Sequence, residues 1–280
     1  MKWEIIVIVL ITLLLLYVVR EYSYSIPKII WCHWDTPEMP EMIRLIYERN
    51  LRKVPDWEFR KITTKQFLEM CPEHELPKSF FSLSVQHKAD FMRLWLLKTY
   101  GGVWSDISTL YNTSLNEMRD ICYKERRQMA GFYIGRDTTR NDSPVFENWF
   151  MMAPRGSTAI RAWFEEYRNA LNMGELNYKK MIVAEGIDLQ GKHHEEDSIY
   201  FTQHYALQRL IQSGKARNII MWKAEDSMFA VQDQCWCDNQ EKQDSCMKTV
   251  FTRERLLSVP WVKLTGGCRQ FVDINVLRSV

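Results

Sequence analysis

The chain has 280 residues, of which 46% are hydrophobic and 26% are charged, as is ordinary for a globular protein. This length allows one large domain or two small ones. The net charge of +2, without a basic block, argues against nucleic acid as a partner. The eleven Trp and twelve Tyr suit either a cleft that stacks on sugars or bases, or simply an aromatic core.

The N-terminal segment contains an apolar run at residues 5–19. We predict an uncleaved signal anchor at residues 1–22, with residues 3–19 in contact with the membrane, because no small-residue cleavage site follows the run. A cleaved signal peptide and a buried globular helix are the alternatives. The prediction describes a single-pass, type II-like membrane protein, with residues 23–280 in the Golgi or ER lumen if the host is eukaryotic.

Four of the seven cysteines lie in the C-terminal part of the chain, at Cys235, Cys237, Cys246 and Cys268. Their spacing differs from the Cys-x₂-Cys spacing of structural zinc sites. In an oxidising lumen, one or two disulfides among them are expected, and the sequence leaves the connectivity open.

The order of the elements predicts an α/β fold. Strands are expected at residues 26–31, 57–62 and 103–105, with helices at 38–50 and 84–100 between them. This alternation is typical of a mostly parallel sheet flanked by helices. Later strands are expected at 131–135 and 148–153, and later helices at 158–171 and 199–207.

Asp90 and Arg93 lie three residues apart in an otherwise apolar helix, so their side chains share one face. Ser84 is a suitable N-cap for this helix, and Gly101 is suited to end it. Burying a carboxylate and a guanidinium costs several kcal/mol each unless both are satisfied. The pair is therefore either an internal ion pair or part of a binding site.

Asp106 and Ser108 follow the next expected strand, after a turn at Gly101 and Gly102. In an extended chain, residues two apart point the same way. Two oxygen ligands at this spacing suit a hard divalent cation such as Mn²⁺ or Mg²⁺. The alternative is that Asp106 only caps the end of the strand.

Two of these segments, residues 90–93 and 100–108, resemble the signature of the sugar transferases with DXD motifs. That family includes the capsular polysaccharide synthesis proteins and the mannosyltransferases of glycosyltransferase family 32. Residues 26–34 resemble the family's first strand, and residues 261–265 resemble its C-terminal motif. The resemblance implies a GT-A-like fold in residues 23–280.

The resemblance also implies an activity, the retaining transfer of a hexosyl group from a UDP- or GDP-sugar to a glycan or polysaccharide acceptor. Asp106 would anchor a divalent cation, with Ser108 as a weaker or water-mediated ligand. Asp90 would accept hydrogen bonds from sugar hydroxyls. Arg93 would hold Asp90 in place or contact phosphate.

Other residues take expected donor and acceptor roles. Gly101 and Gly102 would let the backbone approach the donor closely. Trp31 and Trp34, at the end of the first strand, could stack on the nucleotide base or pack the core. Lys263 would reach the leaving diphosphate. Further candidates are His204 for the acceptor and Asn148, which loosely resembles an asparagine beside the donor site of relatives.

Ser108 is a departure from the family pattern, because it stands where the second acid of the DXD motif is usual. This departure leaves two other functions open. One is a membrane-anchored, inactive pseudo-enzyme that binds glycan. The other is a glycoside hydrolase, which needs two carboxyl groups within roughly 5–10 Å of each other.

Overall fold

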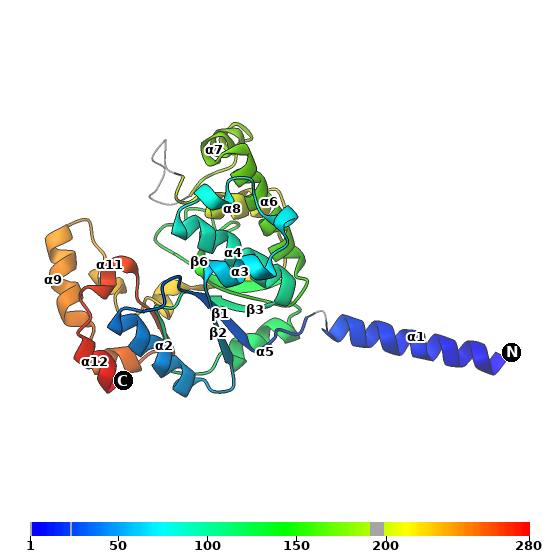
Figure 1. The fold of residues 1–280 in the computed structure, drawn as a ribbon, viewed down its shortest axis with the longest axis horizontal. Helices are drawn as coiled ribbons and strands as arrows, with labels where there is room; N and C mark the ends of the chain where they lie inside the picture. The colour runs from blue at the N-terminus through cyan, green and yellow to red at the C-terminus, as the bar shows by residue number, and fades with distance from the viewer. Residues whose placement is uncertain (1, 23, 191–198) are drawn as a thin grey trace.

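The computed structural model describes residues 2–22, 24–190 and 199–280 (Figure 1). The main sheet contains β1 (Ile29–His33), β2 (Glu58–Ile62), β3 (Gly102–Ser105), β5 (Met129–Tyr133), β6 (Phe146–Ala153) and β7 (Ile219–Lys223). Their spatial order is β2-β1-β3-β6-β5-β7. Only β6 runs antiparallel to its neighbours in this sheet, so the predicted mostly parallel α/β architecture agrees with the structure.

Helices cover both faces of this sheet and extend beyond it. They are α1 (Lys2–Tyr22), α2 (Glu41–Lys53), α3 (Thr64–Met70), α4 (Val85–Tyr100), α5 (Asn116–Lys124), α6 (Thr158–Met173), α7 (Glu175–Ala184), α8 (Thr202–Gln212), α9 (Gln240–Val250), α10 (Arg253–Leu257), α11 (Gly266–Arg269) and α12 (Ile274–Ser279). A second, two-stranded sheet pairs β4 (Thr109–Tyr111) with β8 (Trp261–Lys263) in antiparallel fashion.

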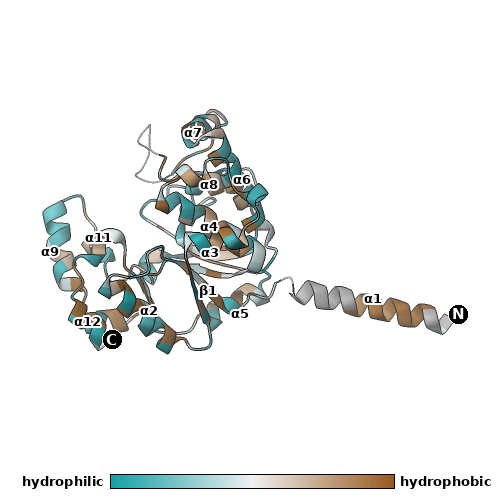
Figure 2. Cartoon of the chain, viewed as in Figure 1, coloured by the Kyte–Doolittle hydropathy of each residue, from teal (hydrophilic) through white to brown (hydrophobic). Residues whose placement is uncertain are grey.

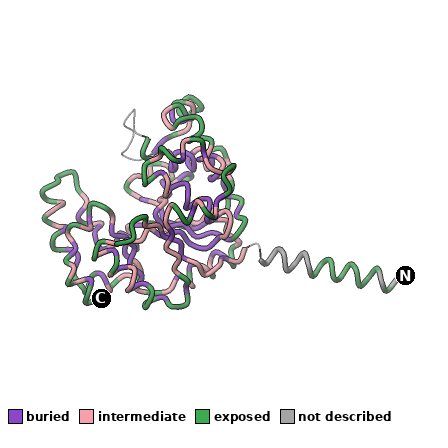
Figure 3. The backbone as a smooth tube through the Cα atoms, viewed as in Figure 1, coloured by how far each residue is buried: buried purple, intermediate pink, exposed green. Residues whose placement is uncertain are grey.

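Alternate side chains of the main sheet enter two separate cores. On β3, Trp104 packs into a core shared with α4, α6 and α8, whereas Val103 packs into a core on the opposite face that includes α5. Figure 3 shows the strands buried between these layers. A third core joins α2 to the C-terminal helices and to the β4–β8 sheet.

The turn that leads from α4 into β3 depends on two glycines. Ser84 caps the start of α4 by accepting a hydrogen bond from the His87 amide, and Gly101 ends the helix with a φ of +69°. A Cβ on Gly101 would lie 2.5 Å from the Arg155 amide nitrogen, and one on Gly102 would lie 2.6 Å from the Ile29 carbonyl oxygen. The close backbone packing of this turn therefore accounts for both glycines.

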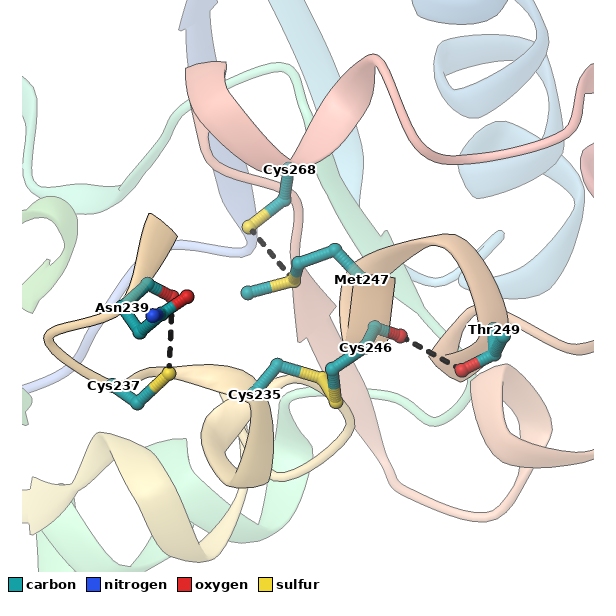
Figure 4. The surroundings of a disulfide bond; sticks show 7 residues. All are labelled: Cys235, Cys237, Asn239, Cys246, Met247, Thr249 and Cys268. Carbon is teal, nitrogen blue, oxygen red and sulfur yellow. Dashed lines mark hydrogen bonds between the residues drawn. A yellow bond between two sulfur atoms is a disulfide. The ribbon is translucent and has the colours of Figure 1, made fainter. Parts of the chain in front are cut away.

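The C-terminal cysteines form one disulfide, between Cys235 and Cys246 (Figure 4). Cys237 is exposed and free, and Cys268 is buried and free, 3.9 Å from the Met247 sulfur. The disulfide joins the segment before α9 to that helix. The sequence had left this connectivity open.

The prediction of a transmembrane helix at residues 1–22 is wrong. In the described part of the chain, no helix has both the length and the apolar character needed to cross a membrane. The apolar run at residues 5–19 is shorter than the roughly 20 residues that a span requires. The single-pass topology is overturned with it, and the Golgi or ER placement loses the helix on which it rested. Figure 2 shows the apolar stretch of α1 apart from the body of the molecule.

Candidate functional site

Four charged side chains, from two consecutive elements and one distant strand, meet beyond the carboxyl end of β3. Asp90 and Arg93 come from α4, Asp106 follows β3, and Lys263 ends β8. Ligands of open α/β sheets commonly bind at the carboxyl ends of parallel strands. The position of this cluster therefore makes it the candidate site.

The Asp90–Arg93 pair, called the inner pair here, is almost completely buried. Arg93 Nη1 lies 3.0 Å from Asp90 Oδ1, as the spacing on one helix face predicts. Asn148 Nδ2 also donates to Asp90 Oδ1 (3.1 Å), and Gln203 Nε2 donates to the Asp90 carbonyl oxygen (2.7 Å). Burial raises the pKa of Asp90 to about 6, although the Arg93 guanidinium opposes the rise.

The Asp106 carboxylate bridges this inner pair to Lys263. Its Oδ1 accepts a hydrogen bond from Trp104 Nε1 (3.2 Å) and lies 3.6 Å from Arg93 Nη2. Its side chain is 33% exposed, and its backbone amide donates to the Trp149 carbonyl oxygen at 2.8 Å. Burial acts to raise the pKa of Asp106, but the charges of Lys263 and Arg93 outweigh it and leave the pKa below its usual value.

The Lys263 ammonium lies between the two side chains predicted to hold a metal. Its Nζ donates to Asp106 Oδ2 at 2.8 Å and to Ser108 Oγ at 2.9 Å. The Asp106–Lys263 pair is called the outer pair below. Pairing of β8 with β4 sets Lys263 opposite Thr109, and Gln232 Nε2 donates to the Lys263 carbonyl oxygen at 2.7 Å. Burial lowers the pKa of Lys263, and Asp106 opposes that effect.

A cavity of about 390 Å³ opens in front of both pairs. Its polar lining residues include Gln86, Asp90, Arg93, Asp106, Glu147, Asn148, His204, Lys263 and Thr265. An adjoining cavity, also of about 390 Å³, shares Glu147, Trp149, Phe201, His204 and Thr265 with the first. The two cavities therefore have a common wall, and together they offer room for two neighbouring ligands.

The side chains at the predicted metal position do not fit a divalent cation. Asp106 is a single carboxylate, and both it and Ser108 already bind the Lys263 ammonium. Among the residues that the structure describes, no group of three or more His, Cys, Asp or Glu side chains could hold a metal. A cation here would have to displace a buried positive charge, which is electrostatically unfavourable.

Several predicted donor residues lie outside the cavity. Trp31 is 1% exposed, and its Nε1 donates to the Gly101 carbonyl oxygen at 3.0 Å, so its indole packs in the core. The Trp34 indole donates to Thr36 Oγ1 at 2.9 Å and does not line the cavity. Gly101 and Gly102 pack against backbone instead of facing the cavity.

His204 lies where the two cavities meet, on α8, with its ring 5.3 Å from that of Phe201.

Two residues at the site, Glu147 and Gln203, were not predicted from the sequence. Glu147 is an acid inside the mostly apolar strand β6, and an acid in such a strand could have indicated a functional residue. Burial raises the pKa of Glu147 to about 7. Gln203 had no signal, because its role depends on contacts with α4, more than a hundred residues away.

The fold and the cluster define an α/β protein with a charged cavity beyond the carboxyl ends of its parallel strands. The chain belongs to the capsular polysaccharide synthesis protein family, whose model matches residues 17–243. This result confirms the family resemblance that the sequence motifs suggested.

Two curated relatives are named as glycosyltransferases. The O-glycosyltransferase braB of Annulohypoxylon truncatum is 27% identical over 161 residues, and the glycosyltransferase afumC of Aspergillus fumigatus is 26% identical over 161 residues. Each match covers 50% of this chain but only 37% and 39% of the respective relative.

A solved structure of the galactosyltransferase LgtC, in complex with donor and acceptor sugar analogues, also resembles this chain. The alignment covers 90% of this chain and 96% of that one, at 9% identity and a TM-score of 0.44. A similarity this distant does not establish a shared fold.

Proposed function

We propose that this chain is a glycosyltransferase that moves a sugar from a nucleoside diphosphate sugar to a hydroxyl group of a glycan or polysaccharide. The observation that carries the proposal is the meeting of the inner and outer pairs at one cavity. The family membership and the two glycosyltransferase relatives support it. We further propose that residues 23–280 form one GT-A-like domain.

The inner pair binds the sugar of the donor in this proposal. The Asp90 carboxylate accepts hydrogen bonds from sugar hydroxyls, and Arg93 and Asn148 hold that carboxylate in position. A buried carboxylate of fixed orientation discriminates between sugars, because a sugar whose hydroxyl lies in the wrong place leaves the carboxylate without a hydrogen-bond partner.

The diphosphate lies beside Lys263 and Arg93. The bond between the anomeric carbon and the diphosphate oxygen breaks, and its electron pair stays on the diphosphate. Cationic donors already in place stabilise that growing negative charge. The acceptor oxygen forms the new bond to the anomeric carbon, and its proton passes to a departing phosphate oxygen. If both events occur on one face of the sugar, the anomeric configuration is retained.

The acceptor occupies the adjoining cavity. Trp149, Phe229 and Trp236 form an aromatic wall there, with ring centroids 5.3 Å apart for Trp149 and Phe229, and 4.9 Å apart for Phe229 and Trp236. Phe132 stacks on one face of Trp149, and the Arg136 guanidinium lies 3.7 Å from the Trp236 ring centroid. The remaining ring surface is therefore what packs against the apolar face of a sugar. His204 and Glu147 lie in the common wall, where an acceptor hydroxyl must approach the donor.

The test is to incubate the full chain with UDP- and GDP-sugars and a panel of glycan acceptors, and to measure nucleoside diphosphate release and labelled product. We expect release that depends on the acceptor. Release that never yields a glycosylated acceptor would indicate a hydrolase. Binding without turnover would indicate a pseudo-enzyme, and absence of binding would overturn the proposal altogether.

A further inference from the structure

We infer that the Lys263 ammonium takes the place of a divalent cation in this site, so that the chain binds a nucleoside diphosphate without metal. The inference rests on the proposed function, because it concerns how the leaving diphosphate is neutralised. A diphosphate can be neutralised by a bound metal or by a cationic side chain. The structure presents the second arrangement.

The position of the Lys263 nitrogen carries the inference. It lies within 2.9 Å of both Asp106 Oδ2 and Ser108 Oγ, the two oxygens that the sequence offers to a cation. An ammonium has three N–H donors, and among the described residues these two oxygens accept two of them. Since Lys263 lines the cavity, the third donor is available to a phosphate oxygen there.

The charges around Lys263 are matched to this role. Two acids with a divalent cation between them would be neutral as a group. Asp106 and Ser108 with one ammonium between them are neutral as well. With Ser108 in place of a second acid, the single charge of the Lys263 ammonium is enough to balance Asp106. Arg93, 3.6 Å from Asp106, places a second cation beside the same carboxylate.

Lys263 is also held rigidly, unlike a surface lysine. Its side chain is 7% exposed, its amide donates to the Met228 carbonyl oxygen at 2.8 Å, and its carbonyl oxygen accepts from Gln232. A charge held in place before the reaction stabilises the leaving group without the cost of reorganisation. A flexible lysine would have to lose side-chain entropy first.

The first experiment measures binding of UDP and GDP to the full chain by calorimetry, with EDTA and then with Mn²⁺. We expect affinities that differ by less than about twofold between the two conditions, and a loss of at least about tenfold in Lys263→Met. The control is Lys215→Met, which removes an exposed lysine outside the cavity and should change nothing. Binding by the wild type only with Mn²⁺ would overturn the inference and leave the proposed function standing.

The second experiment needs no nucleotide. It titrates Mn²⁺ into the wild type and into the double variant Ser108→Asp/Lys263→Ala, with detection by electron paramagnetic resonance. Removal of the ammonium and addition of an acid should create Mn²⁺ affinity that the wild type lacks. Specific Mn²⁺ binding by the wild type would refute the inference even if no nucleotide binds. Circular dichroism establishes whether the double variant is folded. If it is unfolded, Ser108→Asp alone is compared with the wild type. This single variant keeps Lys263, so the ammonium should still exclude Mn²⁺.

Discussion

The inner pair joins residues three positions apart on one helix, whereas the outer pair joins residues 157 positions apart. The Asp90 side chain is 9% exposed and the Asp106 side chain 33% exposed. Both pairs line the cavity, but the inner pair is the more deeply buried, because its carboxylate is much less exposed than that of Asp106. The comparison teaches that one cavity can be lined by two ion pairs that differ in how far their carboxylates are exposed. We expect the inner pair to affect stability more and the outer pair to affect activity more.

The largest expected effect is on stability, from Arg93→Met. This change leaves the Asp90 carboxylate buried without its charge partner, and such a loss costs about 3–5 kcal/mol of unfolding free energy. Urea denaturation followed by fluorescence measures it. The matched control is Arg44→Met, which breaks the exposed Arg44–Glu48 pair on α2 and should cost only about 0.3–0.5 kcal/mol. Equal losses in both variants would show that the inner pair is not a buried structural element.

Asp106→Asn should come next and should affect activity. Loss of the carboxylate removes the charge that orients Lys263, so kcat/KM should fall on the order of 100-fold. Unfolding free energy should change less than in Arg93→Met, because the Asp106 side chain is 33% exposed, so water reaches this position, and the asparagine oxygen can still accept a hydrogen bond from Lys263. The control is Asp56→Asn, at an exposed acid paired with Lys28. A large loss of stability with normal turnover in Asp106→Asn would reverse the roles assigned to the two pairs.

The smallest effect concerns pH and distinguishes the two acids. The pKa of Asp90 is raised to about 6, so protonation of this carboxyl favours the folded state. The stability that Asp90 contributes is fully present below pH 3.8 and is lost as pH rises through about 6. The pKa of Asp106 is lowered, so its contribution is present above the usual value and is lost as pH falls.

Donor binding should therefore weaken as pH falls through about 6, because the protonated Asp90 carboxyl accepts hydrogen bonds less well. Asp90→Asn should remove this pH dependence from donor binding, and the melting temperature difference between wild type and variant should change over the same pH window. Calorimetry and thermal melts between pH 4 and 8 make the measurement. If donor binding to Asp90→Asn still weakens as pH falls through about 6, another group is responsible for the weakening. Glu147 is the next candidate.

Much of the local structure around the site could be predicted from residues 84–105. The apolar run, the Ser84 cap and the terminal Gly101 all appear in the structure as expected for α4. The βα alternation likewise predicted the mostly parallel sheet. The roles assigned to Asp90, Arg93 and Asp106 stay predictions until the variants are measured.

The predicted membrane anchor is wrong, because the run at residues 5–19 is apolar enough but too short to span a membrane. The disulfide was expected in kind, but its partners were decided by the approach of α9 to the preceding segment. Trp31 shows the same limit in another way. An aromatic residue at a strand end has two possible environments, and packing decided for the core.

By itself, the sequence determined what lies within one helix or one strand: the face shared by Asp90 and Arg93, the caps of α4 and the alternation along β3. These features follow from local spacing, which the backbone geometry converts directly into direction. Only the tertiary structure decided that the Lys263 nitrogen lies between Asp106 and Ser108. That contact depends on the pairing of β8 with β4, and no local pattern specifies where a strand from the far end of the chain will dock.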